Sequence, residues 1–301
     1  MVFDIVTFGS AVVDTFIDTE FNKKSQSFNY KAGSKILVNN MTTDIGGGAT
    51  NTAVAFARFG FNTGCICKIG DDNNSNDVLE MLKKEKVKFL GKKSKGATGH
   101  SIILDSKDHQ RTILTFKGPG NSIKLSEIPK IKAKWLYYSS MLNESLKTQE
   151  KLIKQLSKKG TKLAFNPSEY LIKNVNLRSM IKLSDILIMN KEEAEILCSK
   201  YKKKGSFLDG LISLGAKIAV VTDKNKMIYA SDGIKKYSLK PNKIKVIERT
   251  GAGDAFAAGF VAGVMANRPI QKCLELGLKE GESVIQYFGA KNKLLKRKLK
   301  K

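Results

Sequence analysis

The stretch Arg249–Gly259, RTGAGDAFAAG, joins glycines and a carboxylate to the start of a run of good helix formers. Gly251, Ala252 and Gly253 leave their backbone N–H groups uncovered at the expected helix start, where the helix dipole favours an anion. Asp254 would place a carboxylate beside that anion. The pattern predicts a phosphate cradle with a proton acceptor next to it. The alternative is a glycine turn in which Asp254 caps the following helix.

A second glycine cluster, Ile45–Ala53 (IGGGATNTA), also precedes a predicted helix. Glycines such as Gly47 and Gly48 allow a small polar ligand to approach the backbone closely. Asn51 offers a hydroxyl group both a donor and an acceptor. A flexible turn with Asn51 as the helix N-cap explains the same residues equally well.

Short apolar runs alternate with helical patterns along most of the chain, and several of the runs are continuously apolar, as in parallel strands buried on both faces. The βαβα rhythm predicts an α/β fold with a doubly wound, mostly parallel sheet flanked by helices. Ligands of such folds bind beyond the carboxyl ends of the strands. The predicted strands are Phe3–Phe8, Thr63–Ile69, Trp135–Ser139, Leu163–Asn166, Ile186–Met189 and Ala219–Thr222, and the predicted helices are Asn51–Phe59, Asn76–Glu85, Leu146–Lys158, Lys191–Ser199 and Ala255–Ala266.

Two segments, residues 14–45 and 97–118, interrupt this rhythm because they alternate apolar and polar residues without a helical pattern. Gly99–Asp105 and Arg111–Phe116 predict a β-hairpin around a turn at residues 106–110. We expect both segments to form a small β-sheet lid over the strand ends. No repeat or linker divides the chain, so residues 1–301 are expected to form a single domain.

The formal net charge is +25, from 53 Lys and Arg against 28 Asp and Glu, and almost all of the cations are Lys. Base readout and bidentate phosphate contacts favour Arg, so the charge predicts a solvated surface and no nucleic-acid partner. The apolar start contains Asp4 and has no basic leader, which predicts a first strand, no membrane partner and a cytoplasmic location. The cysteines form no C-x-x-C pair and predict reduced thiols without a zinc site, at Cys65, Cys67, Cys198 and Cys273.

Together, the two glycine clusters resemble the signatures of the ribokinase-like (PfkB) carbohydrate kinase family. Ala53, Gly60 and Gly70 fall at the places that the N-terminal signature gives to a small residue and two glycines, and Gly251–Gly259 matches the C-terminal signature. The resemblance covers nearly the whole chain. It implies a ribokinase-like fold and an ATP- and Mg²⁺-dependent phosphotransferase.

On the acceptor side, the resemblance implies that Asp14 holds sugar hydroxyls together with Gly47, Gly48 and Asn51. Asp254 would be the general base for the attacking hydroxymethyl group, with the backbone of residues 251–254 as the anion hole. The residues alone leave a simpler alternative for Asp14, a turn residue at a strand end.

On the donor side, the resemblance implies that Asn190 contacts nucleotide phosphate and that Glu193 organises Mg²⁺ through water. A capping box explains the same two residues without a ligand. The family's glycine-containing nucleotide loop is replaced here by Thr222–Met227, where Thr222 and Lys224 would reach the phosphates. Glu248–Thr250 stands where Asp-Thr-Thr is usual, which leaves activation by K⁺ open.

The identity of the acceptor also stays open. Gly48 replaces a lysine of true ribokinases, and Ser140-Met141 replaces their sugar-binding glutamate. Arg111 and His100 are candidates for binding a sugar phosphate, and a nucleoside base would need an apolar face such as Phe16, Tyr30 or Phe116. A nucleoside kinase and a non-catalytic sugar- or nucleotide-binding member are the alternatives. The exposed edges expected for the lid favour a homodimer.

Overall fold

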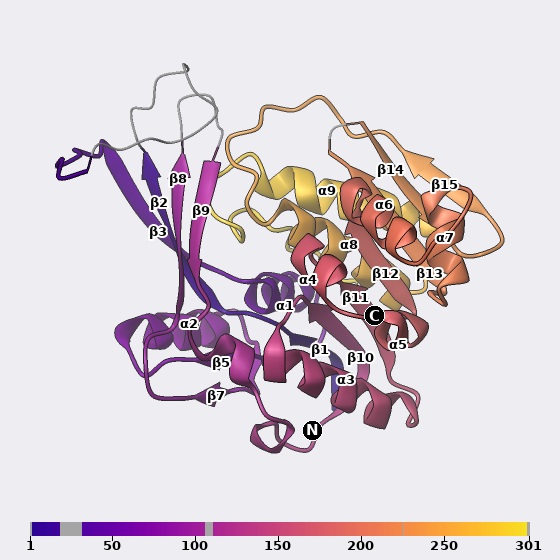
Figure 1. The fold of residues 1–301 in the computed structure, drawn as a ribbon, viewed down its shortest axis with the longest axis horizontal. Helices are drawn as coiled ribbons and strands as arrows, with labels where there is room; N and C mark the ends of the chain where they lie inside the picture. The colour runs from indigo at the N-terminus through magenta and orange to yellow at the C-terminus, as the bar shows by residue number, and fades with distance from the viewer. Residues whose placement is uncertain (1, 19–31, 106–110, 225, 300–301) are drawn as a thin grey trace.

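The computed structural model describes residues 2–18, 32–105, 111–224 and 226–299 (Figure 1). Within these residues the larger sheet has nine strands, in the order β15-β14-β13-β12-β11-β10-β1-β4-β6. Neighbouring strands are parallel except for β13–β14 and β14–β15, which are antiparallel. The strands are β1 (Val2–Phe8), β4 (Thr63–Ile66), β6 (Lys88–Phe89), β10 (Lys132–Ser139), β11 (Lys162–Asn166), β12 (Ile186–Asn190), β13 (Ile218–Asp223), β14 (Met227–Ser231) and β15 (Lys236–Leu239).

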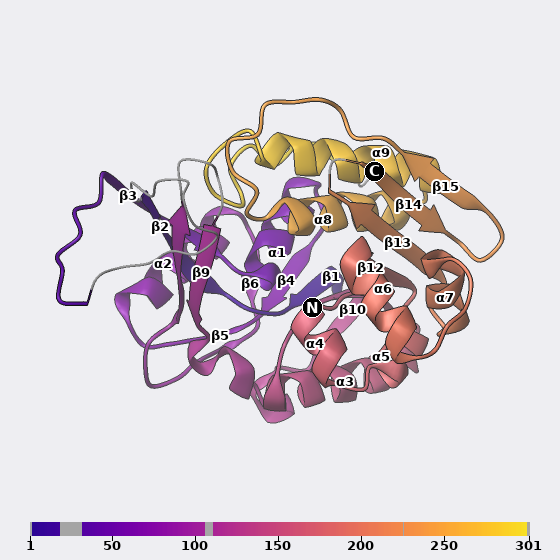
Figure 2. The ribbon, with the colours of Figure 1, turned by 45° about the horizontal axis from the view of Figure 1, so that its top comes forward.

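Helices cover both faces of this sheet (Figure 2). Along β10, Leu136 and Tyr138 pack against one helical layer, while Trp135 and Tyr137 pack against the other. Because successive side chains of a strand point to opposite faces, a strand buried on both sides has a continuously apolar sequence. The first layer is α3 (Asn143–Ser157), α4 (Glu169–Asn174), α5 (Arg178–Lys182), α6 (Lys191–Lys200) and α7 (Phe207–Ser213), and the second is α1 (Gly48–Arg58), α8 (Ala252–Met265) and α9 (Ile270–Val284).

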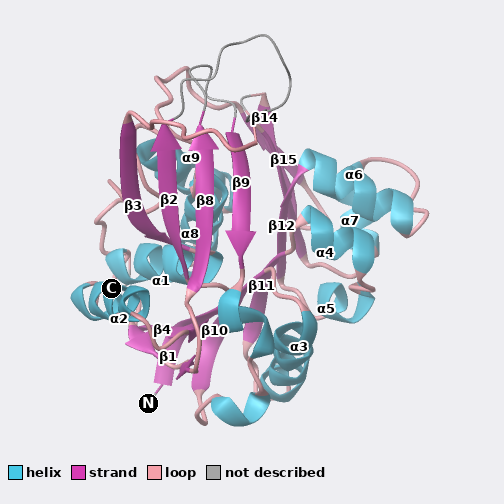
Figure 3. Ribbon diagram, turned by 60° about the vertical axis from the view of Figure 1, so that its left-hand side comes forward, coloured by secondary structure: helices cyan, strands magenta, loops and turns pink. Residues whose placement is uncertain are grey.

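A separate four-stranded sheet stands beside the larger one, in the order β3-β2-β8-β9 (Figure 3). Its strands are β2 (Val12–Asp18), β3 (Asn40–Gly46), β8 (Gly99–Asp105) and β9 (Arg111–Phe116). The predicted hairpin is confirmed, because β8 and β9 pair antiparallel. Strand β2 pairs parallel to β8 and antiparallel to β3.

Two predicted boundaries are wrong. The segment Thr63–Ile69 forms two strands, because after β4 the chain leaves the larger sheet and β5 (Lys68–Ile69) pairs with β7 (Lys92–Lys93). At this break Gly91 packs directly against the backbone of Cys67. A Cβ at Gly91 would lie 1.7 Å from the Cys67 carbonyl oxygen. Helix α1 begins at Gly48, with Gly47 as its N-cap, so Asn51 lies inside the helix.

The sequence pattern also does not predict several short or peripheral elements. These are α4, α5, α7, α9, β6, β7, β14 and β15, while α2 (Asn73–Lys84) begins earlier than expected because Asp72 caps it. Among the described helices, none is both long and apolar enough to cross a membrane.

The topology brings several polar side chains to one edge of the larger sheet. Strands β1, β10, β11, β12 and β13 run parallel, so the residues at their carboxyl ends share that edge. These include Ser139, Asn166, Asn190 and Thr222. Helices α1 and α8, which follow the two glycine clusters, pack against each other.

Candidate active site

A side-chain contact joins the two glycine-led helices. The Asn51 Nδ2 atom donates a hydrogen bond of 2.9 Å to the Asp254 Oδ2 atom. Asn51 is buried, and Asp254 lies in the first turn of α8. The structure therefore brings together one candidate residue from each cluster, although 203 residues separate them in the chain.

The glycines of the first cluster lie against the protein itself. A Cβ at Gly46 would lie 1.8 Å from the Asp14 Oδ2 atom, and one at Gly48 would lie 2.6 Å from the side chain of Ser139. Gly47 has a φ of 100°, which disfavours any other residue. These contacts fix the loop beside Asp14, and the Gly48 N–H group donates to the Ser10 Oγ atom at 3.3 Å.

The second cluster divides into a turn and a pocket-facing half. Gly251 has a φ of 79°, and a Cβ there would lie 2.4 Å from the Ala290 Cβ atom. The Ala252 N–H group donates to the Arg249 carbonyl at 3.3 Å. A Cβ at Gly253, in contrast, would meet nothing within 4 Å, and Gly253 and Asp254 both line a pocket.

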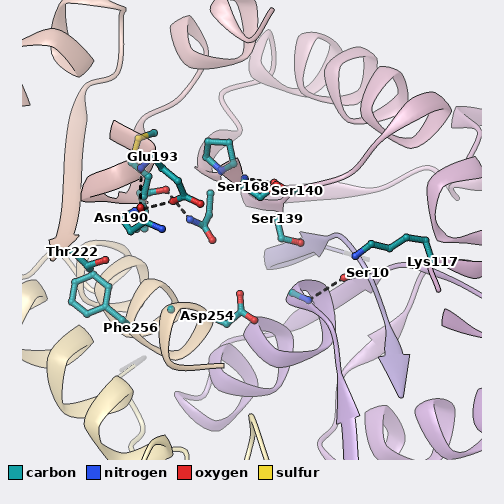
Figure 4. A pocket seen from close by; sticks show the side chains of 16 residues that line it. Ser10, Lys117, Ser139, Ser140, Ser168, Asn190, Glu193, Thr222, Asp254 and Phe256 are labelled. Carbon is teal, nitrogen blue, oxygen red and sulfur yellow. Dashed lines mark hydrogen bonds between the residues drawn. The ribbon is translucent and has the colours of Figure 1, made fainter. Parts of the chain in front are cut away.

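This pocket has a volume of about 380 Å³ and lies at the strand edge described above. Figure 4 shows Asp254 and Ser10 on one side of it and Asn190, Glu193 and Thr222 on the other. A pocket with a carboxylate near one end and a helix start near the other suits a two-part ligand. Its lining residues are Ser10, Gly48, Lys117, Ser139, Ser140, Asn166, Pro167, Ser168, Ile188, Met189, Asn190, Glu193, Thr222, Gly253, Asp254 and Phe256.

Asn190 and Glu193 form the capping box that the sequence allows. The Glu193 N–H group donates to the Asn190 Oδ1 atom at 2.8 Å, and the Asn190 N–H group donates to the Glu193 Oε2 atom at 2.9 Å. The Glu193 Oε1 atom also accepts a hydrogen bond from the Glu169 N–H group at 3.1 Å. Burial raises the pKa of Glu193, and these backbone hydrogen bonds oppose the rise. The capping box and a place in the pocket wall thus coexist.

The other two donor-side candidates differ in position. Thr222 lines the pocket, whereas Lys224 is not among its lining residues. The Lys224 ammonium lies 2.7 Å from a carboxylate oxygen of Glu192. Of the glycine-free stretch, Thr222 and Asp223 are the last residues of β13, and Met227 is the first residue of β14.

Two carboxylates, the buried Asp14 and the half-buried Asp254, dominate the electrostatics of the acceptor end. Burial raises the pKa of Asp14, while a hydrogen bond from Ser101 and the charge of Lys291 oppose the rise. Burial also raises the pKa of Asp254, against a hydrogen bond from Asn51 and the charge of Lys291. Asp14 is not a lining residue of the pocket, and its carboxylate occupies the space that a side chain at Gly46 would need.

Several residues of the site have no distinctive sequence signal. Lys117 is the one cation among the described residues that line the pocket, and Figure 4 shows its side chain extending toward Ser10. Ser139 has a buried Oγ atom without a hydrogen-bond partner in the described structure. Lys291 is buried beside Asn51. A lysine or serine of this kind looks like any other in the sequence.

The predicted acceptor contacts in the small sheet lie elsewhere. His100 shares a hydrogen bond of 2.9 Å with Thr15, and neither lines the pocket. Phe16 is buried, and Phe116 is 56% exposed outside the pocket lining. Tyr30 and the side chain of Arg111 lie outside the described residues.

Comparisons with known proteins agree with this geometry. The sequence is 28% identical to a cytidine kinase of Thermococcus kodakarensis over 300 residues, with 95% of this chain and 97% of the relative covered. It is 23% identical to an ATP-dependent 6-phosphofructokinase of Thermoanaerobacterium thermosaccharolyticum, with 96% and 89% covered. The structure matches that of a ribokinase from Thermotoga maritima with a TM-score of 0.79 and 19% identity, covering 96% of this chain and 95% of that one. This match confirms the predicted ribokinase-like fold.

The sequence profile of the pfkB family carbohydrate kinases matches residues 3–297, nearly the whole chain. The family and the enzyme class predicted from the sequence, a phosphotransferase, are confirmed. The protein therefore belongs to the pfkB family of carbohydrate kinases.

Proposed function

We propose that this protein transfers the γ-phosphoryl group of ATP to a hydroxymethyl group of a small sugar, with Asp254 as the general base. The observation that carries the proposal is the position of Asp254. Its carboxylate is held by Asn51 at the start of α8 and faces a pocket that also contains Asn190 and Glu193. An acceptor and a nucleotide in this pocket would meet at Asp254.

The two carboxylate oxygens of Asp254 have different roles in this proposal. Oδ2 accepts the hydrogen bond from Asn51, whereas Oδ1 lies on the side of Gly48, 3.7 Å from where a Cβ of Gly48 would be. The acceptor hydroxyl donates its proton to Oδ1 as its oxygen attacks the γ-phosphorus. The N–H groups of Gly253 and Asp254 stabilise the charge on the transferring group, and Gly251 and Ala252 form the turn that aims them.

The donor end suits a hydrated Mg²⁺ ion that arrives with the nucleotide. The described residues contain no group of three or more His, Cys, Asp or Glu side chains that could hold a metal. Mg²⁺ commonly keeps several waters and binds through one or two carboxylates and substrate phosphates. Glu193 fits this role through water, since each of its oxygens keeps an acceptor site besides its backbone bond. When bound, the ion neutralises charge on the phosphates, while Asn190, Thr222 and Lys224 attract and position them.

The acceptor end favours a small polar molecule. Ser10 and Ser139 line the pocket beside Gly48, and the buried Ser139 Oγ atom has no partner in the described structure, which suits a substrate hydroxyl. Lys117 adds a positive charge that suits an acceptor with a phosphate or carboxylate group. In our proposal Asp14 accepts from sugar hydroxyls, with Gly47 and Gly48 fixing the loop and Asn51 the base.

A nucleoside is the second candidate acceptor. Its support is the 28% identity to a cytidine kinase over nearly the whole of both chains. The described pocket offers it less, because Phe256 is the one aromatic residue of the lining and the lid aromatic Phe116 is not among them.

Four further features belong to the proposal. Residues 1–301 would act as one kinase domain, in the cytoplasm, where the free thiols of its cysteines would stay reduced. Exposed apolar side chains of the small sheet, such as Met41 and Ile113, support a homodimer through this lid. Both oxygens of the Glu248 carboxylate accept hydrogen bonds from Thr250 in this turn, and activation by K⁺ stays a prediction.

A phosphoryl-transfer screen tests the proposal. The purified protein is given ATP, Mg²⁺ and sugars, sugar phosphates, sugar acids or nucleosides, and ADP release is measured with each acceptor. We expect turnover with a sugar or sugar derivative that depends on Asp254. Turnover with nucleosides alone would favour the second candidate, and binding without turnover for every class would indicate a non-catalytic member.

A further inference from the structure

Lys291 is a lysine buried inside the site, with 6% of its surface exposed. Its ammonium donates a hydrogen bond of 2.8 Å to the Asn51 Oδ1 atom and another to the Ile45 carbonyl oxygen. A buried ammonium is costly unless it is hydrogen-bonded and paired with opposite charge. The burial of Lys291 therefore indicates a role different from that of the many exposed lysines of the chain.

Contacts with α1 and with the turn before α8 hold the backbone of Lys291 in place. The Arg58 Nη1 atom of α1 donates to the Lys291 carbonyl at 2.9 Å. The preceding residue, Ala290, lies against Gly251 at the turn before α8. The Lys291 side chain thus runs from the α8 turn into the region between α1 and the base of the small sheet, where it meets Asn51 and Ile45.

The charges around Lys291 come from four elements. Burial lowers its pKa, and the carboxylates of Asp44 on β3, Asp14 on β2 and Asp254 on α8 oppose this fall. Arg58 on α1 is the cation that adds to the fall. The net environment is acidic, and Lys291 supplies positive charge at its centre.

The hydrogen bond from Lys291 to Asn51 determines the orientation of the Asn51 amide. An ammonium can only donate hydrogen bonds, so the Asn51 atom that faces Lys291 must be the oxygen. The amide nitrogen must then face Asp254, as the 2.9 Å bond shows. Without Lys291 the amide could turn over and present its oxygen to the carboxylate, which would repel it.

We propose that Lys291 is a positioning residue for phosphoryl transfer, which acts through Asn51 to hold Asp254 Oδ2 and leave Oδ1 free for the acceptor. This inference rests on the proposed role of Asp254 as general base. The charge of Lys291 also favours the ionised form of Asp254 that a general base requires, since it lowers the pKa of Asp254 against the effect of burial.

The test compares Lys291→Met with Lys293→Met, a matched control. Lys293 is exposed in the same segment, and its ammonium lies over the ring of Tyr287. We expect Lys291→Met to lower kcat roughly tenfold to a hundredfold, as for loss of a charge-assisted hydrogen bond, with KM for ATP little changed. The acid limb of its kcat–pH profile should move to higher pH, because Asp254 loses a neighbouring positive charge. Lys293→Met should match the parent.

A double-mutant cycle separates positioning from a general structural effect. If Lys291 acts through Asn51, Lys291→Met combined with Asn51→Leu should be no slower than Asn51→Leu alone. Additive losses, or an unmoved acid limb, would overturn the inference. If Lys291→Met does not fold, Lys291→Gln replaces it: this variant can still donate to Asn51, so it should keep more of kcat yet show the same shift of the acid limb. Asp254→Asn with near-parental activity would instead refute the proposed function.

Discussion

The Lys224 ammonium lies 2.7 Å from a carboxylate oxygen of Glu192, at the turn that follows β13. Lys224 adopts a φ of 47°, in the left-handed region, and its side chain is 68% exposed. An exposed ion pair of this kind contributes little to stability, so the ammonium is able to leave Glu192 for an incoming phosphate. In our proposal this glycine-free turn attracts the donor by charge, where glycines would allow close backbone contact.

We therefore expect a relaxed donor preference, with GTP used within about tenfold of ATP, and a donor KM that rises with ionic strength because salt screens an exposed charge. Lys224→Met should raise KM for ATP at low salt and weaken its salt dependence. The matched control is Lys217→Met, at an exposed lysine that is paired with Asp185 just before the start of β13. Steady-state kinetics in KCl and NaCl measure this and also reveal any K⁺ effect. A strict requirement for ATP with a salt-independent KM would contradict it.

Asp254→Asn tests the general base. The asparagine keeps an oxygen to accept the hydrogen bond from Asn51 but cannot take up a proton, so kcat should fall roughly 10²-fold or more while nucleotide binding persists. Asp209→Asn is the control, because Asp209 is an exposed carboxylate paired with Lys236. Nucleotide titration and thermal unfolding check binding and folding. Activity within a few-fold of the parent would refute the assigned role.

Asp14→Ala tests the proposed contact with the acceptor. Loss of a charge-assisted hydrogen bond in a closed site costs about 1.5–3 kcal/mol, so KM for the sugar should rise roughly tenfold to a hundredfold. KM for ATP should stay close to that of the parent. Asp18→Ala, at the exposed end of the same strand, should change neither. An equal rise in both KM values would show that Asp14 is structural.

The sequence predicts those parts of the fold that follow from local residue patterns. The strands β1, β10 and β11 are buried apolar runs, and the pairing of β8 with β9 follows from their alternation. The break between β4 and β5 depends on the close packing of Gly91 against the backbone of Cys67, a contact between residues that are distant in the chain. Such tertiary contacts leave no periodicity in the sequence.

In the site, too, some residues are recognisable from their type in the sequence, and others are distinguished only by their place in the fold. The glycines at 46–48 and Gly251 mark positions where backbone geometry or close packing excludes a side chain, and that requirement is visible as residue type. Lys291 and Lys117 are lysines in a chain rich in lysine, and their distinction is burial or pocket position, which only the fold creates. The sequence allows Asn51 to be a ligand of a hydroxyl group or a helix N-cap, and its contact with Asp254 depends on α1 packing against α8.

Glu280 provides a prediction about stability that is independent of the active site. It lies fully buried in α9, where its Oε2 atom accepts from the Leu295 N–H group at 3.0 Å. Its Oε1 atom has no hydrogen-bond partner in the described structure. Burial raises the pKa of Glu280 from 4.5 to about 7, against the Leu295 hydrogen bond and the charge of Arg58. The folded protein thus holds this proton at pH values where the unfolded chain has lost it.

Between pH 4.5 and about 7 the unfolded chain binds fewer protons at this site, so the free energy of unfolding should fall as pH rises and level off above pH 7. A shift from 4.5 to about 7 is 2.5 pH units, which corresponds to roughly 3 kcal/mol at most. Glu280→Gln keeps the acceptor for Leu295 but cannot ionise. It should therefore be more stable than the parent at pH 8 and similar to it near pH 4.5.

Denaturant titrations from pH 4.5 to 8 measure this difference. Asp14, Glu193 and Asp254 also have raised pKa values, but their effects are common to parent and variant and cancel in the comparison. Glu275→Gln on the same helix, a partly exposed carboxylate paired with Lys272, is the matched control, and its stability should follow that of the parent at every pH. If the curves of the parent and Glu280→Gln run parallel across this range, Glu280 is ionised in the folded protein, and water or a counter-charge must then reach its carboxylate inside α9.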